Sequence, residues 1–297
     1  MNAAIERRAI ALPHGITLDC HLAGAVDAPV LVFLHGFPEA AFVWEPLLAH
    51  FAPRFRCVAP NLRGYAGSSA PAATSAYRVK WLVQDLEALI VEATGGRADR
   101  LAAVVAHDWG GAVAWMAAIH RPELVRRLVV VNSPHPGPFL RDLRDDPAQQ
   151  AASRYMNFLC RDDAAALLAE DGFRRLFDFF LRMGGDAWLT PALRARYAEV
   201  WSKGLEPMLA YYRASPLRPP TPADPGAAGV TLTDAQMTVQ LPTTVIWGDA
   251  DTALPLKLVE GLERWVPRMK RVRVAGATHW IVHEQPERVI AEIDAAL

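Results

Sequence analysis

Asp108 lies between a short apolar run and an alanine-rich run. Residues 101–106 are almost wholly apolar, and residues 112–119 contain no helix breaker. This order predicts a strand, a sharp turn and a helix, with the side chain in the turn directed outward at the end of the strand. Gly110 and Gly111 suit a strained turn in which the helix packs closely against the strand. A carboxylate at this turn can attack carbon and form an ester, whereas the simpler alternative is that Asp108 caps the following helix.

An ester on an aspartate has to be hydrolysed, so the site needs a general base for water and an acid that orients the base. His279 directly follows the last predicted strand and is the candidate base. Asp251 follows the strand before it and is the candidate acid, with nearby Asp249 as its competitor. Loop aspartates commonly bond their own backbone, so either one alone means little. Together, the three candidates follow different strands in the order nucleophile, acid, histidine, which is the order found in α/β-hydrolases.

Hydrolysis of an ester also needs amide donors for the oxyanion that forms on the attacked carbonyl. One donor is expected to be the backbone N–H of Trp109, the residue after the nucleophile. The other is expected from the loop 35–38, where Gly36 allows a tight turn that aims the Phe37 amide inward. Taken alone, this loop would be an ordinary turn at the end of a strand.

The surrounding elements alternate between strand-like and helical patterns, which indicates a mainly parallel sheet with helices on both faces. A hairpin is expected at the start, over 5–12 and 16–23. Further strands are predicted over 30–34, 55–59, 101–106, 128–131, 243–247 and 271–274. Helices are predicted over 43–51, 78–93, 112–119, 256–265 and from 286 onward.

The alternation stops after the segment 132–136, and the following pattern is helical. Helices are predicted over 148–159, 164–168, 173–181, 192–201 and 207–213. A helical stretch between two strand-bearing halves is typical of an inserted lid, which we call the cap. Its exit, the proline-rich segment 215–226, is expected to be an ordered or semi-rigid connector. The predicted organisation is a first core part over 1–137, a cap over 138–235 and a second core part over 236–297.

Length and composition are compatible with an enzyme of this kind. The chain has 297 residues, of which 52% are hydrophobic, and a net charge of −1, which does not favour nucleic acid or an anionic membrane as a partner. The three cysteines, Cys20, Cys57 and Cys160, are widely spaced in apolar segments, so neither a disulfide framework nor a metal cluster is expected. Charged residues interrupt the first twelve positions, so no signal peptide is expected. We therefore expect a soluble, cytoplasmic protein.

Several short motifs resemble those of the soluble epoxide hydrolase family, which has the α/β-hydrolase fold. They are His35-Gly36-Phe37-Pro38-Glu39, His107-Asp108-Trp109-Gly110-Gly111, Asn132-Ser133-Pro134-His135-Pro136, Trp247-Gly248 with Asp251, and the segment from Gly276 to Trp280. The resemblance covers both core parts and is weaker in the cap. It implies a mostly parallel eight-stranded sheet with helices on both faces and an inserted all-helical cap.

The resemblance also implies a reaction, in which an apolar epoxide and water yield a vicinal diol without a metal or organic cofactor. Asp108 would be the nucleophile and His279, oriented by Asp251, the base, with the Phe37 and Trp109 amides as the oxyanion hole. Members of the family use two cap tyrosines to bind and protonate the epoxide oxygen, and the matching positions are Tyr155 and Tyr212. Tyr211 is adjacent, and only one of this pair can point into the site. Side chains expected to contact the substrate are Trp109, Phe37 and His135. The chain would be a monomer or a homodimer.

Other activities fit the sequence less well. Haloalkane dehalogenases are similar in the turn around the nucleophile, in the histidine and in fold. They typically bind the halide with a second side-chain donor besides the tryptophan after the nucleophile, often an asparagine, where this chain has Phe37. Fluoroacetate dehalogenases would carry arginines just after the nucleophile, and a serine esterase would need a serine at position 108. A non-catalytic binding protein on this scaffold would be expected to have a broken triad, yet Asp108, Asp251 and His279 are all present.

Overall fold

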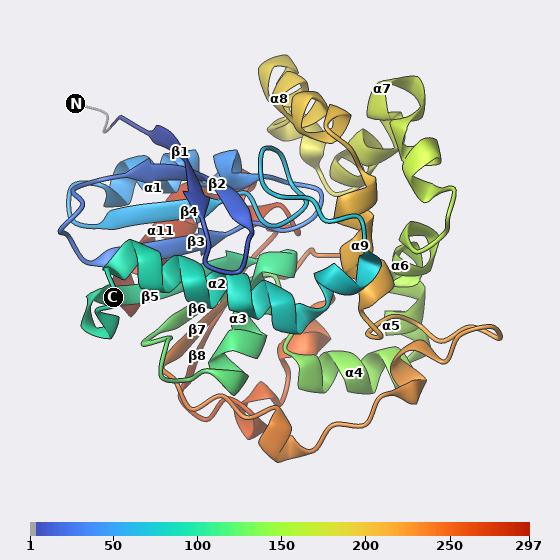
Figure 1. The fold of residues 1–297 in the computed structure, drawn as a ribbon. Coiled ribbons are helices and arrows are strands. Elements are labelled where there is room, and N and C mark those ends of the chain that lie inside the picture. Colours follow the sequence, from blue (N-terminus) through green and yellow to red (C-terminus); the bar gives the residue numbers. More distant parts are fainter. Residues whose placement is uncertain (1–3) are drawn as a thin grey trace.

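The computed structural model describes residues 4–297, and its centre is one eight-stranded sheet (Figure 1). The strands are β1 (Glu6–Ala11), β2 (Thr17–Ala23), β3 (Val30–Leu34), β4 (Arg56–Pro60), β5 (Leu101–His107), β6 (Leu128–Val131), β7 (Thr243–Gly248) and β8 (Met269–Val274). Their order across the sheet is β1-β2-β4-β3-β5-β6-β7-β8. Strand β2 is antiparallel to both β1 and β4, and the remaining pairs are parallel. The predicted α/β-hydrolase fold and its opening hairpin are therefore confirmed.

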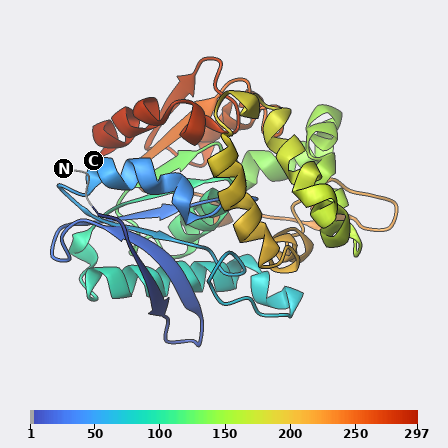
Figure 2. The ribbon, with the colours of Figure 1, turned by 90° about the horizontal axis from the view of Figure 1, so that it is seen from above.

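Helices cover both faces of the sheet, as Figure 2 shows from above. One face carries α1 (Glu45–Phe51) and α11 (Pro286–Ala296), and the other carries α2 (Val79–Thr94) and α3 (Asp108–His120). Every residue of β3, β4, β6 and β7 is buried, because strands covered on two faces need apolar side chains on both. The carboxyl ends of the parallel strands therefore form a rigid edge from which loops can present side chains.

The segment between β6 and β7 is helical, as predicted, and lies at the carboxyl edge of the sheet (Figure 1). Its helices are α4 (Pro136–Asp145), α5 (Pro147–Ala152), α6 (Arg154–Leu159), α7 (Ala164–Leu181), α8 (Pro191–Ser202) and α9 (Glu206–Ala214). Helix α7 is kinked over residues 170–173, which have non-helical backbone angles, so the predicted break between two helices is present there. We keep the name cap for residues 138–235, whose independence as a unit remains a proposal.

Two predicted helices were wrong in detail, and one helix was not predicted. The helix expected over 256–265 is instead two 3-10 turns, Leu256–Val259 and Leu262–Arg264, separated by Gly261 with φ +69°. The helix expected over 148–159 is divided at Ser153 into α5 and α6. Helix α4 was missed because its first turn contains Pro136 and Pro138, although proline is compatible with the first turn of a helix.

Candidate active site

Asp108 is the first residue of α3 and directly follows β5. Its φ of +48° lies in the left-handed region, which is strained for a residue with a side chain. A Cβ on Gly111 would lie 2.3 Å from the Cβ of Ser133, so only glycine allows α3 to approach the end of β6 so closely. The Asp108 side chain does not cap the helix, because His107 occupies the cap position and the Asp108 carboxylate is bonded elsewhere. The sharp predicted turn is therefore confirmed, and the helix-cap alternative is wrong.

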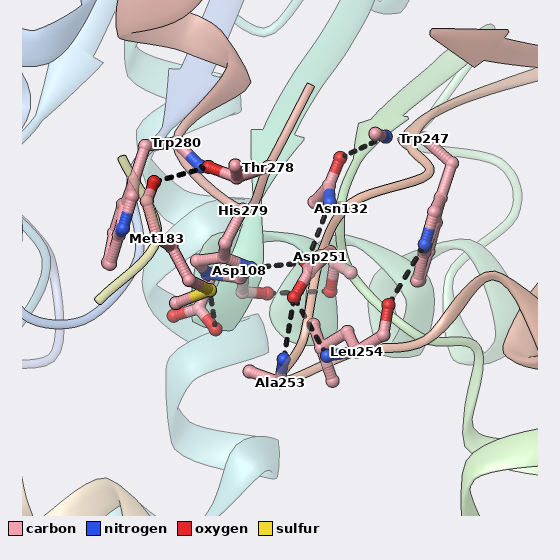
Figure 3. Close-up of polar contacts among 12 residues, drawn as sticks. Asp108, Asn132, Met183, Trp247, Asp251, Ala253, Leu254, Thr278, His279 and Trp280 are labelled. Atoms are coloured by element: carbon pink, nitrogen blue, oxygen red, sulfur yellow. Dashed lines mark hydrogen bonds and ion pairs between the residues drawn. The ribbon is translucent and has the colours of Figure 1, made fainter. Parts of the chain in front are cut away.

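His279 lies between two carboxylates at this edge (Figure 3). Its Nδ1 donates a hydrogen bond to Oδ2 of Asp251 at 2.7 Å, and its Nε2 lies 3.7 Å from Oδ2 of Asp108. Asp251 and His279 are both buried. Asp249 instead pairs with Arg273 on the surface, so Asp251 is the aspartate that the fold brings to the histidine. The three predicted residues therefore come together in the geometry of a catalytic triad.

The charges around His279 favour its protonated form. Burial opposes that form, but the carboxylates of Asp251 and Asp108 outweigh burial and raise the pKa of His279 to about 9. Esterification of Asp108 would remove one of these negative charges. The pKa of His279 would then fall, which would make the imidazole available as a base at the stage when water has to be activated.

Asn132 organises the triad from the end of β6, and the sequence analysis assigned it no role. Its Nδ2 donates to Oδ2 of Asp251 at 2.7 Å, while its Oδ1 accepts from the Gly248 amide at 2.9 Å (Figure 3). The other Asp251 oxygen accepts from the amides of Ala253 and Leu254. These donors hold the carboxylate in one orientation. The sequence signal that could have identified Asn132 is its position directly after a buried strand, at the edge that carries the triad.

The Phe37 amide points into the site, as predicted. It donates to Oδ1 of Asp108 at 2.7 Å, which leaves Oδ2 as the oxygen on the side of His279. A Cβ on Gly36 would lie 2.3 Å from the Cβ of Asp108, so the loop can approach the aspartate only with glycine at that position. The Trp109 amide belongs to the first turn of α3, where N–H groups have no acceptor within the helix.

A cavity of about 490 Å³ opens above Asp108 and is lined mostly by apolar groups. Asp108, Trp109, Tyr155, Tyr211 and Tyr212 all contribute to its wall. Further lining residues that the sequence analysis did not single out include Met116, Phe139, Met156, Leu217, Val230 and Leu232.

The two adjacent tyrosines of α9 have different surroundings. The Tyr211 hydroxyl donates to the backbone carbonyl of Arg63 at 2.7 Å. Both rings pack on Trp109, with centroids 5.4 Å away for Tyr211 and 5.1 Å away for Tyr212. The Tyr212 ring also lies 5.2 Å from Phe37 and 6.2 Å from Tyr155. Burial and the nearby Asp108 raise the pKa of both Tyr155 and Tyr212 well above the usual value, so both stay protonated at neutral pH.

His135 and the Phe37 ring are not among the residues that line the cavity. His135 is buried, with Nε2 donating to the Met237 carbonyl and Nδ1 accepting from the Gly137 amide at the start of α4. Both ring nitrogens are therefore engaged within the fold, and the geometry does not support the expected contact of His135 with substrate. The Phe37 ring packs edge-on against Tyr212, so it supports a side chain of the cavity wall without lining the cavity itself.

The fold and this site together define an α/β-hydrolase with an aspartate at the nucleophile position. Residues 29–286 match the alpha/beta hydrolase fold family. The chain is 35% identical over 277 residues to the AB hydrolase superfamily protein YfhM of Bacillus subtilis, covering 92% of this chain and 91% of that protein. It is 30% identical to Epoxide hydrolase 3 of Xenopus tropicalis, covering 93% of this chain and 73% of that one.

A solved structure described among novel epoxide hydrolases in metagenomes from hot environments is 37% identical. It superposes with a TM-score of 0.87 and covers 99% of this chain and 98% of its own. A haloalkane dehalogenase of Bradyrhizobium diazoefficiens is 28% identical over 90% of this chain and 86% of its own length. This chain belongs to the alpha/beta hydrolase fold family and, within it, to the epoxide hydrolases. Within residues 4–297, no helix is long and apolar enough to span a membrane.

Proposed function

We propose that this protein hydrolyses apolar epoxides to vicinal diols through a hydroxyalkyl ester on Asp108. The observation that carries the proposal is the set of contacts made by the two oxygens of the Asp108 carboxylate. One oxygen is held by the Phe37 amide and the other lies 3.7 Å from Nε2 of His279. Asp108 lines an apolar cavity whose wall also includes Tyr155 and Tyr212. The mainly apolar wall favours an apolar substrate.

In the first half-reaction, Oδ2 of Asp108 attacks a carbon of the epoxide ring. The carbon–oxygen bond of the ring breaks, and its electron pair stays on the epoxide oxygen. Tyr155 and Tyr212 hold this oxygen and one of them protonates it, because a phenol is a donor that remains protonated near neutral pH. The product is an ester between Asp108 and the hydroxyalkyl group.

In the second half-reaction, Nε2 of His279 takes a proton from water, and the resulting hydroxide adds to the ester carbonyl of Asp108. The Phe37 and Trp109 amides stabilise the oxyanion, as Phe37 already binds the corresponding oxygen of the free carboxylate. The intermediate collapses and the carbon–oxygen bond to the alcohol breaks. The proton of the resulting Asp108 carboxylic acid passes to the alkoxide, which restores the carboxylate and releases the diol. The proton on His279 restores the tyrosine through solvent, so the net change is the addition of one water.

The first test compares leaving groups. The protein is incubated with a panel of aryl and alkyl epoxides and a panel of haloalkanes, and diol and halide release are measured separately. Diol release from apolar epoxides with little halide release is the expected result. Halide release as the main reaction would instead identify a dehalogenase, and no turnover of either panel would contradict the proposed function.

A second test traps the ester. The variant His279→Gln lacks the base for water but retains the nucleophile, so the ester should form and persist. Intact-protein mass spectrometry should show the mass of one substrate added, and digestion should locate the adduct at Asp108. Asp108→Asn is the matched control, because it should form no adduct. An unmodified His279→Gln protein after incubation with an epoxide that the wild type consumes would contradict the scheme.

A further inference from the structure

Glu39 is a buried carboxylate that the proposed reaction does not use. It follows Phe37 and Pro38 in the loop that carries the Phe37 amide, and its side chain has no exposure to solvent. Burial opposes its ionisation, but His107 and His283 outweigh burial and hold the pKa of Glu39 well below its usual range. A charged group in the interior is expensive unless its partners are well placed, so the groups around Glu39 must be ordered.

One Glu39 oxygen is bound by residues from two other elements. The Tyr197 hydroxyl donates to Oε1 at 2.9 Å, and Nε2 of His283 donates to the same oxygen at 2.7 Å. Tyr197 lies on α8 of the cap, and His283 lies on α10 (Ile281–Glu284), just after the base. The His283 ring is also stacked on Trp188, with centroids 4.2 Å apart and planes 4° apart.

The second Glu39 oxygen faces the turn that carries the nucleophile. Oε2 lies 3.2 Å from Nδ1 of His107, the residue before Asp108. The opposite nitrogen of this ring, Nε2, donates to the backbone carbonyl of His279 at 2.9 Å. The rings of His107 and His279 are 4.7 Å apart. Three consecutive contacts, from Tyr197 to Glu39, from Glu39 to His107 and from His107 to the His279 carbonyl, therefore join the cap to the backbone of the base.

We infer that Tyr197, Glu39 and His107 are positioning residues that couple the seating of cap helix α8 to the placement of His279. This inference rests on the proposed function, because it concerns the base of the second half-reaction. Glu39 also binds His283, so the segment around His279 is held on both sides. Displacement of a catalytic group by about 1 Å can slow a reaction by a factor of about a hundred, so this anchorage affects the rate of water activation.

The inference predicts a selective defect. Attack by Asp108 needs no base, whereas hydrolysis of the ester needs His279, so loss of an anchoring contact should slow the second half-reaction more than the first. A residue that merely stabilised the fold would affect both half-reactions or neither. The rates of ester formation and ester decay therefore separate a positioning role from a general structural role.

The variant Tyr197→Phe removes one hydroxyl and keeps the ring that packs in the cap. Ester decay should slow about tenfold, the equivalent of one hydrogen bond to a charged group, with ester formation within about twofold of wild type. Both rates are measured in rapid-mixing single-turnover experiments with an epoxide in which the ester is followed by mass spectrometry. The matched control is Arg196→Gln, which breaks the neighbouring contact of α8 with Glu45 at the start of α1. Glu45 lies outside the group formed by Glu39, Tyr197, His107 and His283, which we call the Glu39 cluster.

Glu39→Gln is the second variant, because it removes the charge that accepts from Tyr197 and lies 3.2 Å from His107, and it should slow ester decay more than Tyr197→Phe does. Equal slowing by Arg196→Gln would show that loosening of the cap, and not the Glu39 contacts, causes the defect, and would overturn the inference. Unchanged ester decay in Tyr197→Phe would also overturn it. In either case the wild-type ester would still form and decay, whereas absence of any ester in the wild type would mean that the proposed function itself is wrong.

Discussion

The two oxygens of Asp108 have different surroundings. Oδ1 is bound by the Phe37 amide, and Oδ2 lies 3.7 Å from Nε2 of His279. The same donor can therefore bind the carboxylate before the reaction and the carbonyl oxygen of the ester afterwards. Because the site is built before substrate arrives, little reorganisation is needed during the reaction.

A prediction at the same scale separates the adjacent tyrosines. Tyr212→Phe should lower the rate of ester formation by roughly tenfold to a hundredfold, since it removes a proton donor to the epoxide oxygen. Tyr211→Phe should leave that rate nearly unchanged and cost about 1 kcal/mol of stability, because its hydroxyl donates to the Arg63 carbonyl. Single-turnover kinetics and urea unfolding of both variants provide the two readouts. A larger catalytic loss in Tyr211→Phe would reverse the assignment.

At the scale of elements, the position of Asp108 depends on close approach between α3 and the end of β6. Gly111→Ala should cost about 1–3 kcal/mol, because its new Cβ would lie 2.3 Å from the Cβ of Ser133. The double variant Gly111→Ala with Ser133→Gly removes the opposing atom and should recover part of the loss relative to the sum of the single variants. Urea unfolding of the four proteins measures this coupling. Strict additivity would show that the clash is not the cause.

The elements also show where sequence patterns are reliable. The buried strands and the long helix α2 were predicted almost to the residue, because the strands are uninterrupted apolar runs and the helix repeats its apolar positions over 16 residues. The helix expected over 256–265 does not form, because Gly261 adopts a left-handed conformation. It separates two short 3-10 turns. Single backbone positions can interrupt a favourable helical pattern, and the pattern itself does not reveal them.

At the scale of the whole molecule, the charge of His279 links the site to the stability of the fold. The pKa of His279 is raised from 6.5 to about 9 in the native state, so the native state binds this proton more tightly than the unfolded chain does. The resulting stabilisation is complete below about pH 6.5, shrinks as the pH rises toward 9, and is lost above that value. One pKa unit corresponds to about 1.4 kcal/mol, so the change amounts to a few kcal/mol.

The predicted measurement is the free energy of unfolding of wild type and His279→Gln between pH 5.5 and 9.5. The difference between the two proteins should be most favourable to wild type at the acid end and should fall by a few kcal/mol toward the alkaline end. His120→Gln is the control, because His120 is exposed and forms no ion pair within residues 4–297. A difference for His279→Gln that is independent of pH would contradict the proposed charge on the buried histidine.

The sequence by itself determined the fold class, the turn at Asp108 and the edge of the sheet that carries Asp251 and His279. These features follow from local signals, namely apolar periodicity, glycines beside a strand end and the order of polar residues after successive strands. A residue in such a pattern can be assigned to an element and an edge before anything is known of its neighbours.

Only the tertiary structure decided where each of two neighbouring candidates lies. It brings Asp251, and not Asp249, to His279, and it turns the Tyr211 hydroxyl toward Arg63 while the Tyr212 ring lies beside Phe37 and Tyr155. It also assembles the Glu39 cluster from parts of the chain that are far apart in sequence. The physical reason is that side-chain direction and long-range hydrogen bonds are set by packing between elements, and the local sequence carries no record of that packing.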